Sequence, residues 1–182
     1  DWSAFDRTLT RKFEISMKQA TLSEQKVIGM KLARLLEDIL DEPERAVDVY
    51  RELLDVAPDD DDVFMGLESL LSAEDRWEDI LDLRNNRLQR IDSDEGRAQQ
   101  LTEMARVLVR LEDIGSALDR LDQALRAIPG DEDAVSLTWS LFQHEEHRNQ
   151  VSDLLEDHFR ATNDSARLIT LLTDRLAHAA HL

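Results

Sequence analysis

Apolar residues recur along this chain at steps of three and four positions, the spacing that places side chains on one face of an α-helix. Trp2, Phe5, Leu9 and Phe13 form the first such stripe. The pattern predicts an all-α chain of about eight to ten helices and no sheet. The predicted helices cover about 1–15, 23–40, 43–57, the segment from Asp59–Asp62 to 73, 77–91, 96–111, 116–128, 131–143, 148–161 and 163 onward.

A long internal repeat organises these helices. The segment PERAVDVYRELLDVAPDDDD, Pro43–Asp62, returns in diverged form as IGSALDRLDQALRAIPGDED, Ile114–Asp133. Four residues reappear 71 positions later (117 − 46 = 71), with Ala46, Tyr50, Leu53 and Pro58 matched by Ala117, Leu121, Ala124 and Pro129. A fixed period of this kind is typical of stacked repeats, in which each unit buries its apolar face against its neighbours.

Around this repeat the chain resembles the tetratricopeptide repeat, a helix–turn–helix unit of 34 residues with the pattern W-x₂-L-G-x₂-Y…A-x₃-F…P. The matching positions are Leu32-Ala33-x₂-Leu36…Ala46-x₃-Tyr50…Pro58 and Met104-Ala105-x₂-Leu108…Ala117-x₃-Leu121…Pro129. The units between them match less well. The resemblance implies a right-handed α-solenoid of antiparallel helix pairs, with a concave groove for peptides or partner proteins and no chemistry of its own.

We therefore predict one repeat domain over 1–182. It consists of a half-unit, four units and a truncated unit, at about 1–20, 26–60, 61–97, 98–131, 132–169 and 170–182. Because both ends cut through the repeat, we expect a fragment of a larger repeat protein. Its end residues should be partly exposed or covered by another chain, which allows end-to-end self-association. These residues are Trp2, Phe5 and Phe13 at one end and Leu171, Leu172 and Leu176 at the other.

The charge of the chain restricts its partners. With 22 basic and 40 acidic side chains the net charge is −18, so nucleic-acid phosphates and anionic lipid surfaces should be repelled. No stretch approaches the roughly 20 apolar residues of a membrane span, which argues against membrane insertion. The chain has no cysteine, and its start, DWSAFDR, is not a signal peptide. We predict a cytoplasmic protein.

Residues with the spacing of a catalytic or metal site do not stand out. We find no Ser/His/Asp arrangement, Gly-rich phosphate loop or carboxylate pair, so we predict no enzyme activity and no cofactor. His144 and His147 are three residues apart, whereas two zinc-binding histidines on one helix face are four apart, so we predict no metal. Asp59–Asp62 is expected to cap a helix rather than to bind a cation.

The three tryptophans, Trp2, Trp77 and Trp139, allow two interpretations. They could form an aromatic binding surface. Their position on or beside apolar stripes favours packing at helix interfaces instead.

In the tetratricopeptide family the first helix of each pair lines the concave face. Projecting the helical period from the buried positions places nine residues there, namely Met30, Arg34, Met65, Ser69, Thr102, Arg106, Arg110, Ser136 and Ser140. Three arginines on one surface would make a positive strip that could hold carboxylates of a partner. The alternative is that they pair with nearby acids such as Glu37, Asp38 and Glu103.

The predicted function is a non-enzymatic scaffold that binds a partner protein or peptide. The alternatives are a regulatory or targeting module of a larger multidomain enzyme and an acidic mimic of nucleic acid. Solvated helix faces explain most of the acidic charge and argue against the mimic.

Overall fold

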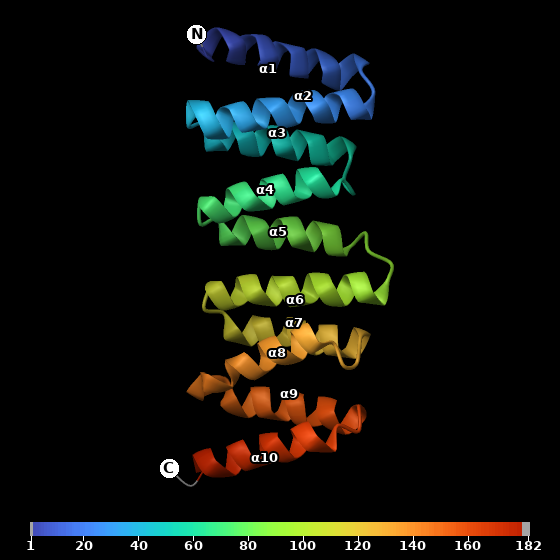
Figure 1. The fold of residues 1–182 in the computed structure, drawn as a ribbon, viewed down its shortest axis with the longest axis vertical. Helices are drawn as coiled ribbons and strands as arrows, with labels where there is room; N and C mark the ends of the chain where they lie inside the picture. Colours follow the sequence, from blue (N-terminus) through green and yellow to red (C-terminus); the bar gives the residue numbers. More distant parts are fainter. Residues whose placement is uncertain (1, 180–182) are drawn as a thin grey trace. The chain divides into compact units, whose positions relative to one another are not determined.

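The chain folds into helices joined by short turns. The structure is a computed structural model that describes residues 2–179, and these residues contain no strand. The chain divides into two compact units, 1–83 and 84–182, which are described separately here. Within each unit, successive helices run in opposite directions (Figure 1). The prediction of an all-α repeat fold is confirmed.

The first unit contains α1 to α4 and the first half of α5. Their bounds are α1 Trp2–Gln19, α2 Leu22–Leu35, the π-helical turn η1 Leu36–Leu40, α3 Pro43–Val56, α4 Asp61–Ala73 and α5 Trp77–Leu88.

The second unit contains the rest of α5 and the helices after it. Their bounds are α6 Asp94–Arg110, α7 Ile114–Ala127, α8 Glu132–Ser140, the 3₁₀ turns η2 Leu141–Gln143 and η3 Glu145–His147, α9 Arg148–Ala161 and α10 Ser165–Ala179. Residue 1 of the predicted half-unit and residues 180–182 of the predicted truncated unit lie outside the described residues.

Side chains cap the helix starts as the sequence predicts. At α2 the Thr21 side chain accepts a hydrogen bond from the Glu24 amide, and the Glu24 carboxylate accepts one from the Thr21 amide. At α4 the Asp60 carboxylate accepts hydrogen bonds from the amides of Asp62 and Val63, both at 3.1 Å. These bonds satisfy amides that have no partner inside the helix. The capping role predicted for the aspartate run is confirmed at Asp60.

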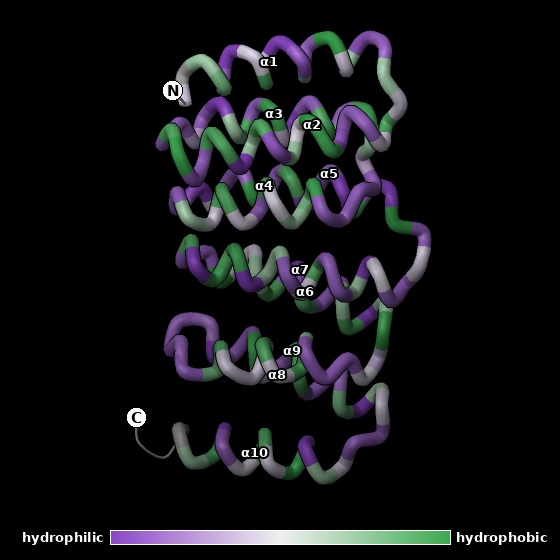
Figure 2. Tube along the Cα trace, turned by 45° about the horizontal axis from the view of Figure 1, so that its top comes forward, coloured by the Kyte–Doolittle hydropathy of each residue, from purple (hydrophilic) through white to green (hydrophobic). Residues whose placement is uncertain are grey.

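Small residues lie where consecutive helices approach most closely. Ala33 and Ala46 in the first unit, and Ala105 and Ala117 in the second, are fully buried. Gly29 is also required, because a Cβ atom there would lie 2.8 Å from both Leu53 Cδ1 on α3 and Phe13 Cε2 on α1. Hydrophobic and hydrophilic residues alternate along each helix, so every helix has one face for the core and one for water (Figure 2).

Two of the predicted helices are interrupted. The helix predicted over 23–40 is α-helical only to Leu35 and continues as the π-helical turn η1. After η1 the chain reverses at Asp41, whose φ of 57° is left-handed, and the Glu42 amide donates to the Leu36 carbonyl at 2.9 Å. The helix predicted over 131–143 ends at Ser140 and tightens into η2. Both changes are confined to the last turn of a helix, which is too short for the hydrophobic spacing to predict it.

The expected apolar ends are only partly exposed. Trp2 is 56% exposed and packs edge-to-face on Phe5, which is also exposed, so the prediction that Trp2 packs in the core is wrong. Trp77 and Trp139 are half-buried, and Trp139 packs against Phe159 with ring centroids 5.9 Å apart.

The exposure predicted for the ends is confirmed at Trp2, Phe5, Leu172 and Leu176 and is wrong at Phe13 and Leu171. Phe13 is buried because its ring packs against Gly29. On α10, Leu171 is 0% exposed, whereas Ile169, which was not predicted, is exposed together with Leu172 and Leu176. End-to-end self-association stays a prediction.

None of the described helices has the length and the apolar character needed to cross a membrane.

Enlarging a buried alanine should destabilise the fold. Ala46→Leu and Ala117→Leu add side-chain volume where two helices touch, so each should lower the free energy of unfolding by about 1–3 kcal/mol. Denaturation in urea measures the change. The matched control is Ala166→Leu, at an exposed position of α10. Equal stability of all three variants and the unsubstituted chain would contradict the repeat alignment.

Replacing a residue that has a left-handed backbone conformation by glycine should stabilise the fold. Four non-glycine residues, Asp41, Asp75, Glu112 and Asn163, follow helices with positive φ, and Glu112 has a φ of 60°. Such a conformation costs a non-glycine residue about 1–2 kcal/mol, and glycine adopts it freely. Glycine also makes the unfolded chain more flexible, which offsets part of this gain. Glu112→Gly should therefore raise the free energy of unfolding by roughly 0.5–1 kcal/mol. Glu112→Ala removes the same charge and keeps Cβ, so it should show no such gain; equal stability of the two variants would disprove the explanation.

Candidate functional site

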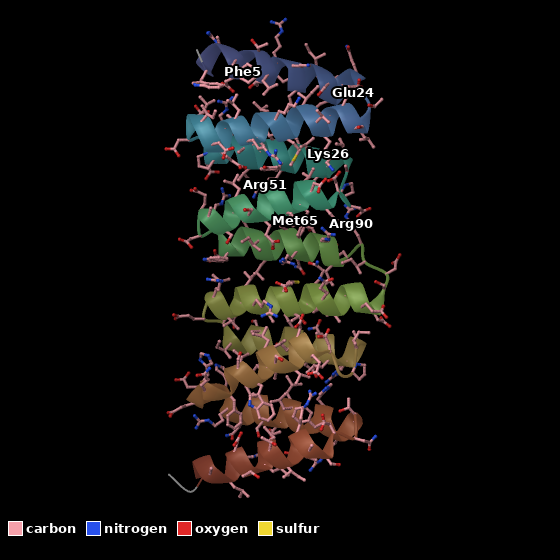
Figure 3. All side chains as sticks on the ribbon, in the orientation of Figure 1. Phe5, Glu24, Lys26, Arg51, Met65 and Arg90 are labelled. Carbon is pink, nitrogen blue, oxygen red and sulfur yellow. The ribbon has the colours of Figure 1, made fainter. Side chains whose placement is uncertain are left out.

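Four of the nine predicted groove residues meet in the first unit. Met30 and Arg34 from α2, and Met65 and Ser69 from α4, line one open hollow of about 770 Å³. Glu37 from η1 and Tyr50 from α3 also line it, and we call this surface the α2–α4 groove. Figure 3 labels Met65 on α4 and Lys26, a further lining residue, on α2.

The helical period of α2 explains which side chains face the groove. Gly29, Leu32 and Ala33 lie on the buried face of α2, and Val27 and Met30 lie on the other face, among the lining residues. Lys31 and Arg34 continue that face along the helix. One side of α2 therefore holds the core together, and the other presents apolar and cationic groups to the groove.

A missing side chain on α4 shapes the floor of the groove. A Cβ atom on Gly66 would lie 2.8 Å from Tyr50 Cε1 and 3.0 Å from the Tyr50 hydroxyl oxygen. Gly66 therefore lets the Tyr50 ring approach the backbone of α4. Met65 beside it is 65% exposed, which leaves a flexible apolar side chain in water at the rim.

The acidic side chain at the floor is only partly accessible. Glu37 lies in the π-helical turn η1, and its Oε1 atom is buried with no hydrogen-bond partner among the described residues. Burial raises the pKa of Glu37, and the Tyr50 hydroxyl, which donates a hydrogen bond to the carboxylate, acts in the opposite direction. Burial raises the pKa of Tyr50 as well, and the Glu37 charge adds to that effect. Both groups are thus buried neighbours that keep their protons more strongly than they would in water.

Two basic residues of the groove are free to meet a ligand. Lys31 and Arg34 are exposed, and neither makes an ion pair with a described residue. Lys26, in contrast, bridges the start of α4, with its Nζ 2.9 Å from Asp60 Oδ1 and 2.7 Å from Asp62 Oδ2. Asp62 and then Asp60 raise the pKa of Lys26. Lys26 therefore ties α2 to α4, while Lys31 and Arg34 remain available.

The other five predicted groove residues belong to the second unit. Arg106 is exposed and pairs with Glu103, with Nε 3.3 Å from Oε1, which is the alternative that the sequence left open. Arg110, Ser136 and Ser140 are exposed as well. Thr102 is only 2% exposed, so its side chain is not on the surface of the chain. Because Arg34 belongs to the other unit, the convergence of three arginines on one surface stays a prediction.

Sequence reasoning missed three side chains of the groove. Tyr50 was assigned only to the repeat core, and Glu37 was considered only as a partner for arginine. Lys31 was overlooked although it lies four residues after Val27 on the same helix face. Glu37 lies three residues after Arg34 and seven after Met30, so the helical spacing was a signal that could have found it.

The histidine and aspartate candidates do not form a metal site. Within residues 2–179 no group of three or more His, Asp or Glu side chains has an arrangement that could hold a metal ion. His144 precedes the turn η3 and His147 is its last residue, with His147 Nδ1 2.9 Å from Gln150 Oε1.

Comparison with known proteins gives structural neighbours only. No family model and no curated protein match the sequence. Among solved structures, that of MamA, a tetratricopeptide-repeat protein, matches at a TM-score of 0.51 and 12% identity, over 92% of both chains. YrrB, described as a TPR protein with an unusual peptide-binding site, matches at a TM-score of 0.40 and 16% identity, over 96% of this chain and 98% of that one.

At this identity the likeness to MamA concerns the fold alone. It agrees with the repeat read from the residues and with the antiparallel helices of each unit. The chain is an all-α helical-repeat protein with the tetratricopeptide fold.

The raised pKa of Glu37 predicts a stability that falls with increasing pH. Between the ordinary value of 4.5 and the raised value, the folded chain keeps a proton that the unfolded chain has released, so each rise in pH favours unfolding. Glu37→Gln carries no charge and can still accept the hydrogen bond of Tyr50. It should be more stable than the unsubstituted chain at pH 8, and this advantage should shrink toward pH 5.

Urea denaturation at intervals between pH 5 and pH 8 measures this difference. The matched control is Glu14→Gln, which removes an exposed carboxylate of α1. A Glu37→Gln advantage that is constant over the whole pH range would contradict the assignment.

Proposed function

We propose that the chain is a non-enzymatic scaffold that binds a partner protein, through a peptide segment of that partner, in the α2–α4 groove. The observation that carries the proposal is the convergence of Met30, Met65 and Arg34 on one hollow. Exposed methionines suit the binding of partners, because their unbranched side chains adapt to different shapes. Apolar side chains next to free cationic groups offer both burial and charge-assisted hydrogen bonds.

Binding explains the groove better than catalysis does. Side chains with shifted pKa values often mark active sites, and Glu37 and Tyr50 have such shifts. The Glu37 oxygen Oε1 is buried and the carboxylate accepts a hydrogen bond from Tyr50, so neither group of the pair is presented to a bound molecule as an exposed base would be. The pair is better explained as part of the wall that supports the groove.

The net charge of −18 supports a protein partner over nucleic acid. Phosphate backbones bind through cationic surfaces that release counterions. Two free cationic side chains in a strongly acidic chain do not make such a surface. We propose that the chain binds no nucleic acid.

Placing a charge at the rim should weaken partner binding. Met65→Glu puts a carboxylate where we expect an apolar side chain of the partner, and loss of a contact of about 2 kcal/mol corresponds to a roughly 30-fold loss of affinity. The intact chain is used to capture partners, and the affinity of each purified partner is then measured by calorimetry. The control is Val56→Glu, an exposed apolar position at the end of α3 outside the groove.

Two results separate the outcomes of this experiment. Unchanged affinity of Val56→Glu together with weak binding of Met65→Glu supports the groove. Full affinity of Met65→Glu, with its melting temperature unchanged, would mean that the partner binds elsewhere.

A further inference from the structure

A second hollow adjoins the α2–α4 groove within the first unit. It lies between α1 and α2, has a volume of about 510 Å³ and is lined by residues that include Lys12, Ile15 and Gln19 of α1. Val27 of α2 lines both hollows. The two hollows therefore share a wall, and a bound segment long enough to pass Val27 would contact α1, α2 and α4.

The combined surface carries several apolar side chains. Ile15 and Val27 are 50% and 51% exposed, Met65 is exposed further, and Met30 is half-buried. We call the surface formed by these four residues with Lys12, Lys31 and Arg34 the extended groove. Its apolar side chains come from three helices, so a ligand with several apolar side chains would bury them together.

The acids that line the two hollows are mostly occupied. Glu24 accepts hydrogen bonds from Thr21 in the capping box, and these lower its pKa so that it keeps its charge, whereas Asp62 forms an ion pair with Lys26. Glu37 accepts a hydrogen bond from Tyr50. Asp38 is the remaining acid among the described lining residues.

The cations of the extended groove make no ion pair with a described residue, although the charge of Arg34 lowers the pKa of both Glu37 and Tyr50, against the effect of burial. Lys12, Lys31 and Arg34 are exposed and form no ion pair or hydrogen bond with a described side chain. Several arginines elsewhere in the chain contact carboxylates, as Arg76 does with Glu44 and Asp79 and Arg167 does with Glu132 and Asp164. The extended groove brings three exposed cations without an ion pair next to exposed apolar side chains.

The distance over which charges act decides whether the net charge of the chain or the local charge of the groove governs binding. The net charge of −18 favours a basic partner at long distance. At physiological ionic strength, however, exposed charges are screened beyond about 8 Å. A bound segment therefore interacts mainly with the side chains it touches, and in the extended groove the free ones are mostly basic.

We propose that the extended groove binds an acidic amphipathic segment of a partner protein. Apolar side chains of this segment contact Ile15, Val27, Met30 and Met65, and its carboxylates accept hydrogen bonds from Lys12, Lys31 and Arg34. This inference rests on the proposed function and adds the chemistry of the partner to it. It also assigns a binding role to α1, which the predicted groove did not include.

Three labelled peptides of about 15 residues test the proposal by fluorescence anisotropy with the full chain. The first has Leu at helical positions i, i+3, i+4 and i+7 and Glu between them. The second keeps the Leu residues and replaces Glu with Lys, and the third keeps Glu and replaces Leu with Ser. We expect the Leu/Glu peptide to bind at least tenfold more tightly than either of the others.

Charge reversal identifies the residues responsible. The double variant Lys31→Glu with Arg34→Glu should bind the Leu/Glu peptide at least tenfold more weakly than the unsubstituted chain does, and it should bind the Leu/Lys peptide more tightly. The matched control reverses Arg11 and Lys18, two exposed cations of α1 outside the extended groove. The control should change binding less than threefold, and a thermal melt of each variant verifies that it remains folded.

Four results would overturn the proposal. The Leu/Lys peptide could bind more tightly than the Leu/Glu peptide, or the Ser/Glu peptide could bind as tightly as the Leu/Glu peptide. The Arg11 and Lys18 control could lose as much affinity as the Lys31 and Arg34 variant, or no peptide could bind at all. The proposed function is judged separately, because a captured partner whose affinity falls with Met65→Glu still binds in the α2–α4 groove. If that partner is also unaffected by Met65→Glu, both proposals fail.

Discussion

The fold of the first unit depends on the close contact of helix backbones at residues without bulky side chains. Gly29 admits Leu53 on one side and Phe13 on the other, so one missing Cβ holds α1, α2 and α3 together. Gly66 does the same for Tyr50, and the Tyr50 hydroxyl in turn contacts Glu37. The floor of the groove is thus a direct consequence of helix packing. Protein interiors are packed densely enough that a change of one methyl group at such a contact is felt.

Charge contributes little to holding the helices together. Most ion pairs among the described residues have at least one exposed side chain, and such surface pairs contribute about 0–1 kcal/mol each. Buried alanines and leucines supply the stability instead, because burial of apolar surface is the larger effect. The exposed charges are therefore free to be arranged for binding. At α2 this separation is clear, since Leu32 and Ala33 face the core while Lys31 and Arg34 face the groove.

Helix ends position the polar groups of the groove. Glu37 lies in the π-helical turn η1 that follows α2, where its carboxylate accepts a hydrogen bond from Tyr50. Such turns cost hydrogen-bond geometry and are found at functional sites more often than elsewhere. Lys26 acts at the other end, where it joins α2 to the aspartates that begin α4. Polar contacts therefore join the start of α2 to α4 and the turn after its end to α3, with the exposed face of α2 between them.

The sequence by itself determined the helices, their order and much of the core, because these depend on local spacing. The capping box at Thr21, the buried alanines Ala46 and Ala117, and four residues of the groove follow from a helical period and a repeat. The helical spacing of apolar residues does not show which of them a distant segment of the chain will cover. Leu171 is buried while Ile169 is exposed, and Thr102 is buried although its stripe predicted a surface position. Only the tertiary structure decided these positions and placed Glu37 beside Tyr50, because each depends on contacts between residues far apart in the chain.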